Sequence, residues 1–152
     1  YIVADEPVSM IDASSRIEIL DLLRGLQDSR GVSILYITHD IASARYVSDR
    51  LLVMYAGHIV ESGPTESVLA DPKHPYTQLL LSAVPDPRAP LAVQAAEVSE
   101  PPLMIEPGEG CRFRGRCPLA VEQCIEITPR PRELAPGHTA ACHLAGRVEA
   151  GR

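Results

Sequence analysis

Residues 1–70 of the sequence predict an α/β fold with a parallel sheet. Two short apolar runs, at residues 1–4 and 32–37, have the length and β-branched content of buried strands. The stretch between them has helical spacing and one apolar face, formed by Ile19, Leu22, Leu23 and Leu26. Strands that alternate with helices along a chain are typical of a parallel sheet covered by helices.

Turn and capping signals place the other elements of this region. Asp12 or Ser14 can cap the first helix, and Gly31 can end it. The dipeptide Ala56-Gly57 stands between two apolar runs and predicts a β-hairpin. The remaining elements that we expect are a short helix ending near residue 47, strands at 51–55 and 58–61, and helices at 66–70 and 76–83.

Composition changes after residue 70 and divides the chain into three parts, residues 1–70, 71–108 and 109–152. The middle part is rich in proline and predicts a stiff, extended linker. The last part holds all four cysteines and few aliphatic side chains. Such a tail is expected to bury little core, and therefore to need a cross-link or a metal to hold a shape.

Charge and hydropathy exclude two classes of protein. The formal net charge of −6 disfavours non-specific binding to nucleic acid, which depends on neutralising phosphates with basic side chains. No run of the sequence reaches the roughly 18 apolar residues that a membrane-spanning helix requires.

Two carboxylates, Asp5 and Glu6, follow the first predicted strand directly, and Pro7 then turns the chain. The carboxyl end of a parallel strand is where α/β sheets bind their ligands. An aspartate there can hold Mg²⁺, and an adjacent glutamate can polarise a water molecule. The pair by itself can equally be the start of a helix, since carboxylates also serve as N-caps.

Two further motifs give this pair a context. Ser9-Met10-Ile11-Asp12 follows it closely, and Thr38-His39-Asp40 follows the next predicted strand. With these motifs in this order the chain resembles the ATP-binding cassette (ABC) ATPases. Residues 1–6 are similar to the Walker B strand of that family, residues 9–12 to its D-loop, and His39 to its switch histidine. Met10 and Ile11 stand where the family usually has alanine and leucine.

The resemblance implies a fold and a role for four side chains. The fold would be the C-terminal part of a P-loop ABC ATPase domain, followed by the proline-rich linker and the small cysteine-containing tail. Asp5 would hold the Mg²⁺ of MgATP, and Glu6 would act as general base or orient the attacking water. His39 would contact the γ-phosphate, and Asp12 would lie at the interface between two ATPase subunits. Taken alone, His39 would be interpreted as a structural histidine at a strand end, with its hydrogen bonds made within the protein.

The sequence contains no Gly-x-x-x-x-Gly-Lys-Ser/Thr motif and no Leu-Ser-Gly-Gly-Gln-like signature. Backbone amides and a lysine must cradle the phosphates in P-loop enzymes, so these residues alone are expected to be inactive as an ATPase. The chain also begins within a strand and without methionine, so we expect it to be a C-terminal fragment of a longer protein.

The segment His74-Pro75-Tyr76-Thr77-Gln78-Leu79-Leu80 resembles the extension of the oligopeptide and dipeptide importer ATPases. That resemblance implies an ATPase on the cytoplasmic face of the inner membrane. Its partners would be a second ABC ATPase subunit, two membrane permeases and a periplasmic or lipoprotein solute-binding protein, with no nucleic acid. The solute would be a peptide, although this branch also serves nickel and glutathione uptake. The purely structural alternative is a helix that starts at a proline and packs through its leucines.

Four cysteines, Cys111, Cys117, Cys124 and Cys142, are the candidate metal ligands of the tail. Four thiolates can hold either Zn²⁺ or a [4Fe–4S] cluster. Structural zinc sites usually contain a tight Cys-x₂₋₄-Cys pair, which this tail lacks, and the resemblance to the importer ATPases favours the cluster. Neighbouring arginines would offset its charge, and His138 and His143 would be spare ligands. The alternatives are free, buried thiols and, in an oxidising compartment, disulfides.

Two other functions compete with the importer. The first is a DNA-repair or chromosome-associated ABC-type ATPase with a zinc module, against which the acidic net charge and the His74 segment both argue. The second is a truncated product that keeps only the metal-binding tail as a regulatory module.

Overall fold

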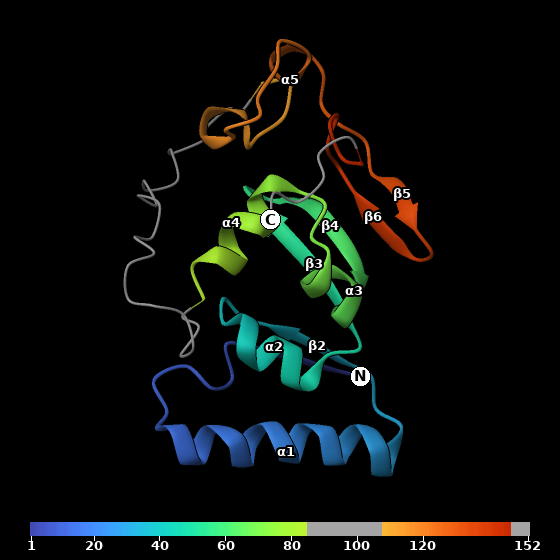
Figure 1. The fold of residues 1–152 in the computed structure, drawn as a ribbon. Helices are drawn as coiled ribbons and strands as arrows, with labels where there is room; N and C mark the ends of the chain where they lie inside the picture. The colour runs from blue at the N-terminus through green and yellow to red at the C-terminus, as the bar shows by residue number, and fades with distance from the viewer. Residues whose placement is uncertain (85–107, 147–152) are drawn as a thin grey trace. The chain divides into compact units, whose positions relative to one another are not determined.

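The computed structural model describes residues 1–84 and 108–146, which are drawn in colour in Figure 1. The chain divides into two compact units with the boundary between Asp49 and Arg50. The linker predicted within residues 71–108 lies largely outside the described residues. Among the described residues, no helix is both long and apolar enough to cross a membrane.

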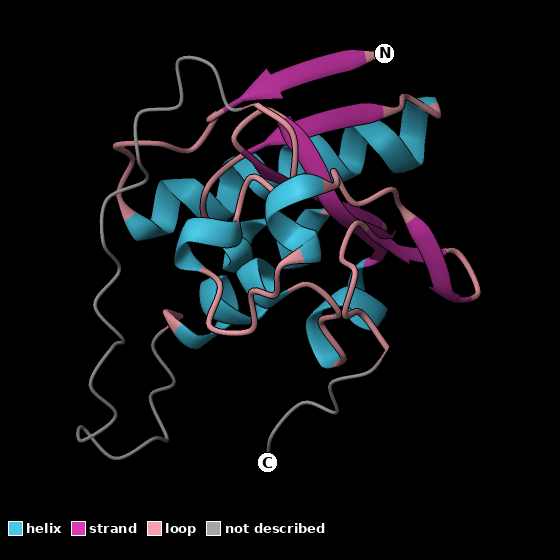
Figure 2. Ribbon diagram, turned by 90° about the horizontal axis from the view of Figure 1, so that it is seen from above, coloured by secondary structure: helices cyan, strands magenta, loops and turns pink. Residues whose placement is uncertain are grey.

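The first unit is a two-stranded parallel sheet with two helices. Its elements are β1 (Ile2–Asp5), α1 (Ala13–Arg30), β2 (Ile34–Ile37) and α2 (Ile41–Val47). Val3 of β1 lies opposite Leu35 of β2, and Asp5 lies opposite Ile37. Figures 1 and 2 both place α1 on one face of this strand pair. The predicted order of strand, helix, strand and helix is confirmed.

Capping explains where α1 begins and ends. The Asp12 carboxylate accepts hydrogen bonds from the amides of Ser14 and Ser15, both at 3.1 Å, which satisfies two of the free N–H groups at the helix start. At the other end Gly31 adopts φ 62°, a left-handed conformation, and donates to Gln27 O at 2.9 Å. Of the two predicted caps, the structure uses Asp12.

The apolar face of α1 differs from the predicted one. Leu20 is the buried residue of the helix, whereas Leu22, which we expected on the apolar face, is 63% exposed. Leu23 and Leu26 are half-buried. The covered face is therefore centred on Leu20 and Leu23, because α1 also packs sideways against α2, where Arg24 donates to Tyr46 O at 3.0 Å.

The second unit is built on an antiparallel hairpin of β3 (Arg50–Tyr55) and β4 (His58–Pro64). Its turn residues Ala56 and Gly57 have φ values of 47° and 80°. Two consecutive positive φ values match the twist of a tight hairpin, which confirms the predicted turn. Two helices follow as predicted, α3 (Thr65–Ala70) and α4 (Pro75–Ser82).

The cysteine-containing tail joins the same sheet. Its elements are η1 (Arg114–Arg116), α5 (Gln123–Glu126), β5 (Arg132–Ala135) and β6 (His138–Ala140). β6 pairs antiparallel with β4, and the sheet order is β3-β4-β6-β5. The tail is thus held by strand pairing, which the sequence did not predict.

The tail also contributes a core, contrary to our expectation. Phe113, which is 2% exposed, packs with Tyr55 and Val60 of the hairpin. Its ring centroid lies 5.2 Å from that of Tyr55, 5.4 Å from that of Tyr76 and 5.8 Å from that of His74. One aromatic side chain therefore fastens the tail to both the hairpin and α4, because rings at these separations attract beyond their buried area.

We predict that Phe113→Ala destabilises the second unit by about 3–5 kcal/mol, since it removes a fully buried ring. The free energy of unfolding is measured by urea titration with tyrosine fluorescence, because Tyr55 and Tyr76 flank Phe113 and the chain has no tryptophan. Ile125→Ala, at a site that is 60% exposed, is the matched control and should change stability by less than about 0.5 kcal/mol. Equal effects of the two substitutions would contradict this role of Phe113.

Candidate functional site

The carboxyl ends of β1 and β2 bring the first group of predicted residues together. Asp5 is the last residue of β1, and the amide of Glu6 still donates to Ile37 O of β2 at 2.9 Å. Glu6 has a φ of 46°, a left-handed conformation that is rare outside glycine. This conformation turns the chain at the end of the strand, so Glu6 leaves the sheet beside the residues that follow β2.

Glu6 and His39 are in direct contact. Oε1 of Glu6 lies 2.7 Å from Nδ1 of His39 and accepts a hydrogen bond from the His39 backbone amide at 3.1 Å. Because an ionised carboxylate only accepts, Nδ1 is the donor of this pair. The imidazole is thereby oriented by the carboxylate, while the His39 side chain remains 84% exposed. The second ring nitrogen, Nε2, is the one left to meet a ligand.

The predicted D-loop is a tight turn that ends at the helix cap. Ser9 donates to Glu6 O through its amide at 3.1 Å and through its hydroxyl at 2.9 Å. Met10 then adopts φ 59° and is fully exposed. The pKa of Asp12 is lowered, chiefly by hydrogen bonds from Ser15 and also by the amide of Ser14. Asp12 is therefore a charged group at the start of α1.

Arg16 was not singled out by the sequence, yet it lies between the two motifs. Its Nη2 is 3.5 Å from the carbonyl oxygen of Ile11, and its Nη1 is 3.8 Å from Oδ2 of Asp40, next to His39. Arg16 is placed there by α1, in which it lies one turn after the capping residue. No local signal in the sequence distinguishes it from any other arginine on a helix.

The four cysteines of the tail gather near one another as free thiols. The amide of Cys111 donates to Cys124 O at 2.8 Å, and Cys124 and Cys142 are buried. Burial raises the pKa of Cys111 and of Cys117, and the neighbouring thiols, Cys142 among them, raise both pKa values further. Cys111 and Cys117 thus lie within electrostatic reach of the other thiols, and their raised pKa values favour the protonated form of these two side chains.

The side chains that could bind a metal are not arranged as a metal site. In residues 1–84 and 108–146, no group of three or more His, Cys, Asp or Glu side chains could hold a metal ion. The predicted spare ligands are also engaged. His138 is 2% exposed with Nε2 2.6 Å from Glu61, and Nε2 of His143 lies 2.8 Å from Ile127 O. The part of the chain that the structure describes therefore supports neither the expected cluster nor the alternative zinc site.

Three arginines of the tail bind backbone carbonyls around the cysteines. Arg112 donates to Ala56 O, and Arg114 donates to Glu109 O and to Cys111 O. Arg132 donates to Cys142 O at 3.0 Å and to His143 O at 3.4 Å. We expected Arg112, Arg114 and Arg116 to offset the charge of a cluster. In the structure Arg112 and Arg114 bind backbone carbonyls, as does Arg132, which was not among them.

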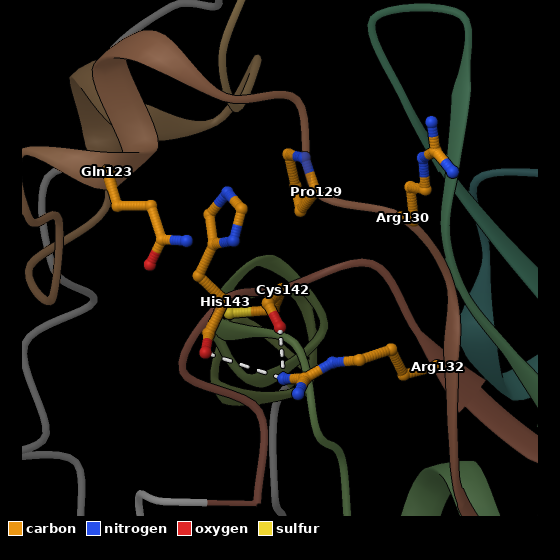
Figure 3. Close-up of a pocket in the computed structure, with 6 residues that line it drawn as sticks. All are labelled: Gln123, Pro129, Arg130, Arg132, Cys142 and His143. Atoms are coloured by element: carbon orange, nitrogen blue, oxygen red, sulfur yellow. Dashed lines mark hydrogen bonds between the residues drawn. The ribbon is translucent and has the colours of Figure 1, made fainter.

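A pocket of about 240 Å³ lies beside Cys142 (Figure 3). Arg132 reaches across it to the carbonyl oxygens of Cys142 and His143. The other residues that line it are Gln123, Pro129 and Arg130. Its lining is polar and contains no carboxylate, so the approach to Cys142 from this side is electropositive.

A buried carboxylate, Glu61, links three segments of the second unit. Its oxygens accept hydrogen bonds from the amide of Lys73 at 2.8 Å and from that of His74 at 2.9 Å, and Oε1 contacts His138 Nε2. Burial lowers the pKa of His74 to about 4, against the opposing effect of the Glu61 charge, so His74 is neutral near pH 7. Its Nδ1 accepts from the amide of Tyr76 at 3.0 Å and caps α4. No local signal in the sequence singles out Glu61, because a lone glutamate in a strand is usually exposed.

Residues 60–124 match the family described as "Oligopeptide/dipeptide transporter, C-terminal region". The matched segment is less than half of this chain, which is similar there to the C-terminal region of that family. The match includes β4, both helices after the hairpin and three of the four cysteines.

Relatives extend the similarity to both units. A peptide import ATP-binding protein of Brucella ovis is 42% identical over 146 residues, which are 93% of this chain and 45% of the relative. An oligopeptide transport ATP-binding protein of Bacillus subtilis is 40% identical over 152 residues, 98% of this chain and 46% of the relative. A peptide import ATP-binding protein of Brucella abortus is 44% identical over 145 residues, 94% of this chain and 42% of the relative.

The chain spans less than half the length of these relatives. It is therefore homologous to a part of a peptide import ATP-binding protein, in agreement with the resemblance drawn from the Walker B, D-loop and switch-histidine motifs.

We predict that Gly110→Ala disrupts the loop that carries the first cysteine. A Cβ at this position, where φ is 94°, would lie 2.2 Å from Ile125 O and 2.7 Å from Cys124 O, so the contact between Cys111 and Cys124 must break. The expected loss is about 1–3 kcal/mol of local stability, measured as faster hydrogen exchange of the Cys111 amide.

Gly115→Ala is the matched control, because a Cβ there meets no atom within 4 Å. It should leave the exchange of the Cys111 amide nearly unchanged. Equal exchange rates in the two variants would show that Gly110 is not required for its backbone conformation.

Proposed function

We propose that the protein to which this chain belongs is the ATP-hydrolysing subunit of an ABC importer for oligopeptides or dipeptides. The observation that carries the proposal is the contact between Glu6 Oε1 and His39 Nδ1 at the carboxyl ends of two parallel strands. Ligands of α/β sheets bind at such ends, and this pair is suited to act on a water molecule there. Similarity to peptide import ATP-binding proteins over nearly the whole chain supports the same function.

Each of the four residues has a proposed task in hydrolysis. Asp5 holds the Mg²⁺ that accompanies ATP, since the ion prefers carboxylate and water oxygens. Glu6 accepts a proton from the attacking water or orients it. His39, fixed through Nδ1 by Glu6, presents Nε2 toward the γ-phosphate. Asp12 stands at the start of α1, where its lowered pKa keeps it charged for a contact with the second ATPase subunit.

The whole importer supplies the remaining parts. A P-loop and a signature sequence must come from residues outside this chain, because its own sequence has neither. The assembly proposed is two ATPase subunits on the cytoplasmic face of the inner membrane, two permeases and a solute-binding protein. Closure of the ATPase pair on ATP would drive the permeases between inward-facing and outward-facing states.

We also propose that the four cysteines take up a [4Fe–4S] cluster. Thiols are the ligands of such clusters, and these four lie near one another with guanidinium groups holding their loops. The preference for the cluster over zinc rests on the spacing of the cysteines, which includes no tight Cys-x₂₋₄-Cys pair. A bound cluster would supply a covalent link between residues 111–124 and Cys142.

Glu6→Gln is predicted to lower the ATPase rate of the assembled importer by about 10²–10⁴-fold, since it removes the group that acts on water. MgATP binding should persist, because the phosphates are gripped elsewhere. His39→Ala should have a similar effect on the rate. The control is Glu18→Gln, an exposed carboxylate on α1, which should hydrolyse ATP like the unmodified protein. Full activity of Glu6→Gln would refute the assignment.

The cluster is tested by purifying the full-length protein without oxygen and measuring its visible absorption, iron and zinc. A broad band near ~400 nm from thiolate-to-iron charge transfer, with about four irons per chain, is the expected result. Cys124→Ser should abolish both signals. One zinc per chain and no colour would overturn the cluster and revive a zinc module.

A further inference from the structure

Two different sets of contacts position the four thiols. Cys111, Cys117 and Cys124 belong to one segment, and the hydrogen bond between the Cys111 amide and Cys124 O closes it locally. Cys142 comes later, after the β5–β6 hairpin. Its place beside the others therefore depends on contacts made outside residues 111–124.

Those contacts are made by β6 on β4. Ala140 lies opposite Glu61, and Thr139 lies opposite Ser62. The next amide, that of Ala141, donates to Val60 O at 2.8 Å, and Cys142 follows directly. Cys142 lies within electrostatic reach of Cys111 and Cys117, so the pairing of β6 with β4 brings Cys142 near the earlier cysteines. The position of Cys142 is thus set by how β6 lies on β4.

β6 is only three residues long and gains little from its own ladder. Its strongest side-chain contact is His138 Nε2 on Glu61 Oε1, at 2.6 Å, with the two side chains 2% and 0% exposed. The same carboxylate is fixed by the amides of Lys73 and His74. A buried carboxylate that lost His138 would be left with an uncompensated acceptor, so the arrangement resists displacement of β6.

We propose that Glu61 is a positioning residue for the thiol group of the tail: through His138 it holds β6 on β4, and thereby holds Cys142 beside the other three cysteines. This inference rests on the proposed function only for what the thiols bind. The placement of Cys142 is a property of the reduced, metal-free protein and can be tested there.

The experiment uses the full-length protein in reduced, metal-free form, with Glu61→Ala compared with Ser62→Ala. Ser62 is the next residue of β4, and its hydroxyl also bonds across to β6, 2.9 Å from Thr139 Oγ1, but carries no charge. Two rates are measured by mass spectrometry: alkylation of each cysteine and hydrogen exchange of the Ala141 amide.

We expect Glu61→Ala to raise the alkylation of Cys142 and the exchange of Ala141 by at least about tenfold, as befits loss of a buried charged pair. Cys124, which is 6% exposed and held by the local loop, should stay protected. Ser62→Ala should change each rate by less than about threefold. This selective release separates positioning of Cys142 from general loss of the tail structure.

Two results would overturn the proposal. One is unchanged protection of Cys142 in Glu61→Ala; the other is equal release of Cys124 and Cys142. The Asp71 amide, which donates to Ser67 O at the end of α3, reports whether the second unit remains folded. If it loses protection in Glu61→Ala, His138→Gln decides by the same two criteria. If the unmodified protein binds no iron, the cluster is wrong, but the alkylation pattern still tests Glu61.

Discussion

The second unit depends on a carboxylate that has no access to water. Glu61 is 1% exposed, and a charge in such a place is tolerated only when its oxygens are satisfied by donors. Its donors come from two segments far apart in the sequence: the Lys73 and His74 amides before α4, and His138 in the tail. The carboxylate and Phe113 thus both hold separate segments of the second unit together, the carboxylate through polar contacts and Phe113 through apolar ones. Together they hold the hairpin, the segment before α4 and the tail in one unit.

Much of the first unit could be predicted because its signals are local. A run of apolar residues, a capping aspartate and a glycine after the helix each act within a few positions of themselves, as Asp12 and Gly31 do for α1. The candidate site followed from the same locality. Parallel strands end at one edge, so Glu6 after β1 and His39 after β2 had to come close. The error on Leu22 arose because packing against α2, a tertiary effect, rotated the buried face of α1.

The tail could not be predicted in the same way. Its strands are three and four residues long, and its pairing joins Glu61 to Ala140 across a large sequence separation. The composition of the tail suggested too few aliphatic side chains to form a core. We therefore expected its shape to depend on a cross-link or a metal bound by the cysteines. Burial of a single aromatic ring and a histidine depends on partners elsewhere in the chain, which no window of the tail contains. Phe113 and His138 carried no local sign of their roles.

The position of β6 in the sheet has one more consequence. Without β6, the peptide groups of β4 at Glu61 and Ser62 would face outward, and open strand edges of this kind recruit strands from other chains. With the tail in place, β5 is the strand that ends the sheet on this side. It is short, and its residues Arg132 and Glu133 are exposed and of opposite charge. The cysteine-containing tail therefore also protects the hairpin from self-association through its open edge.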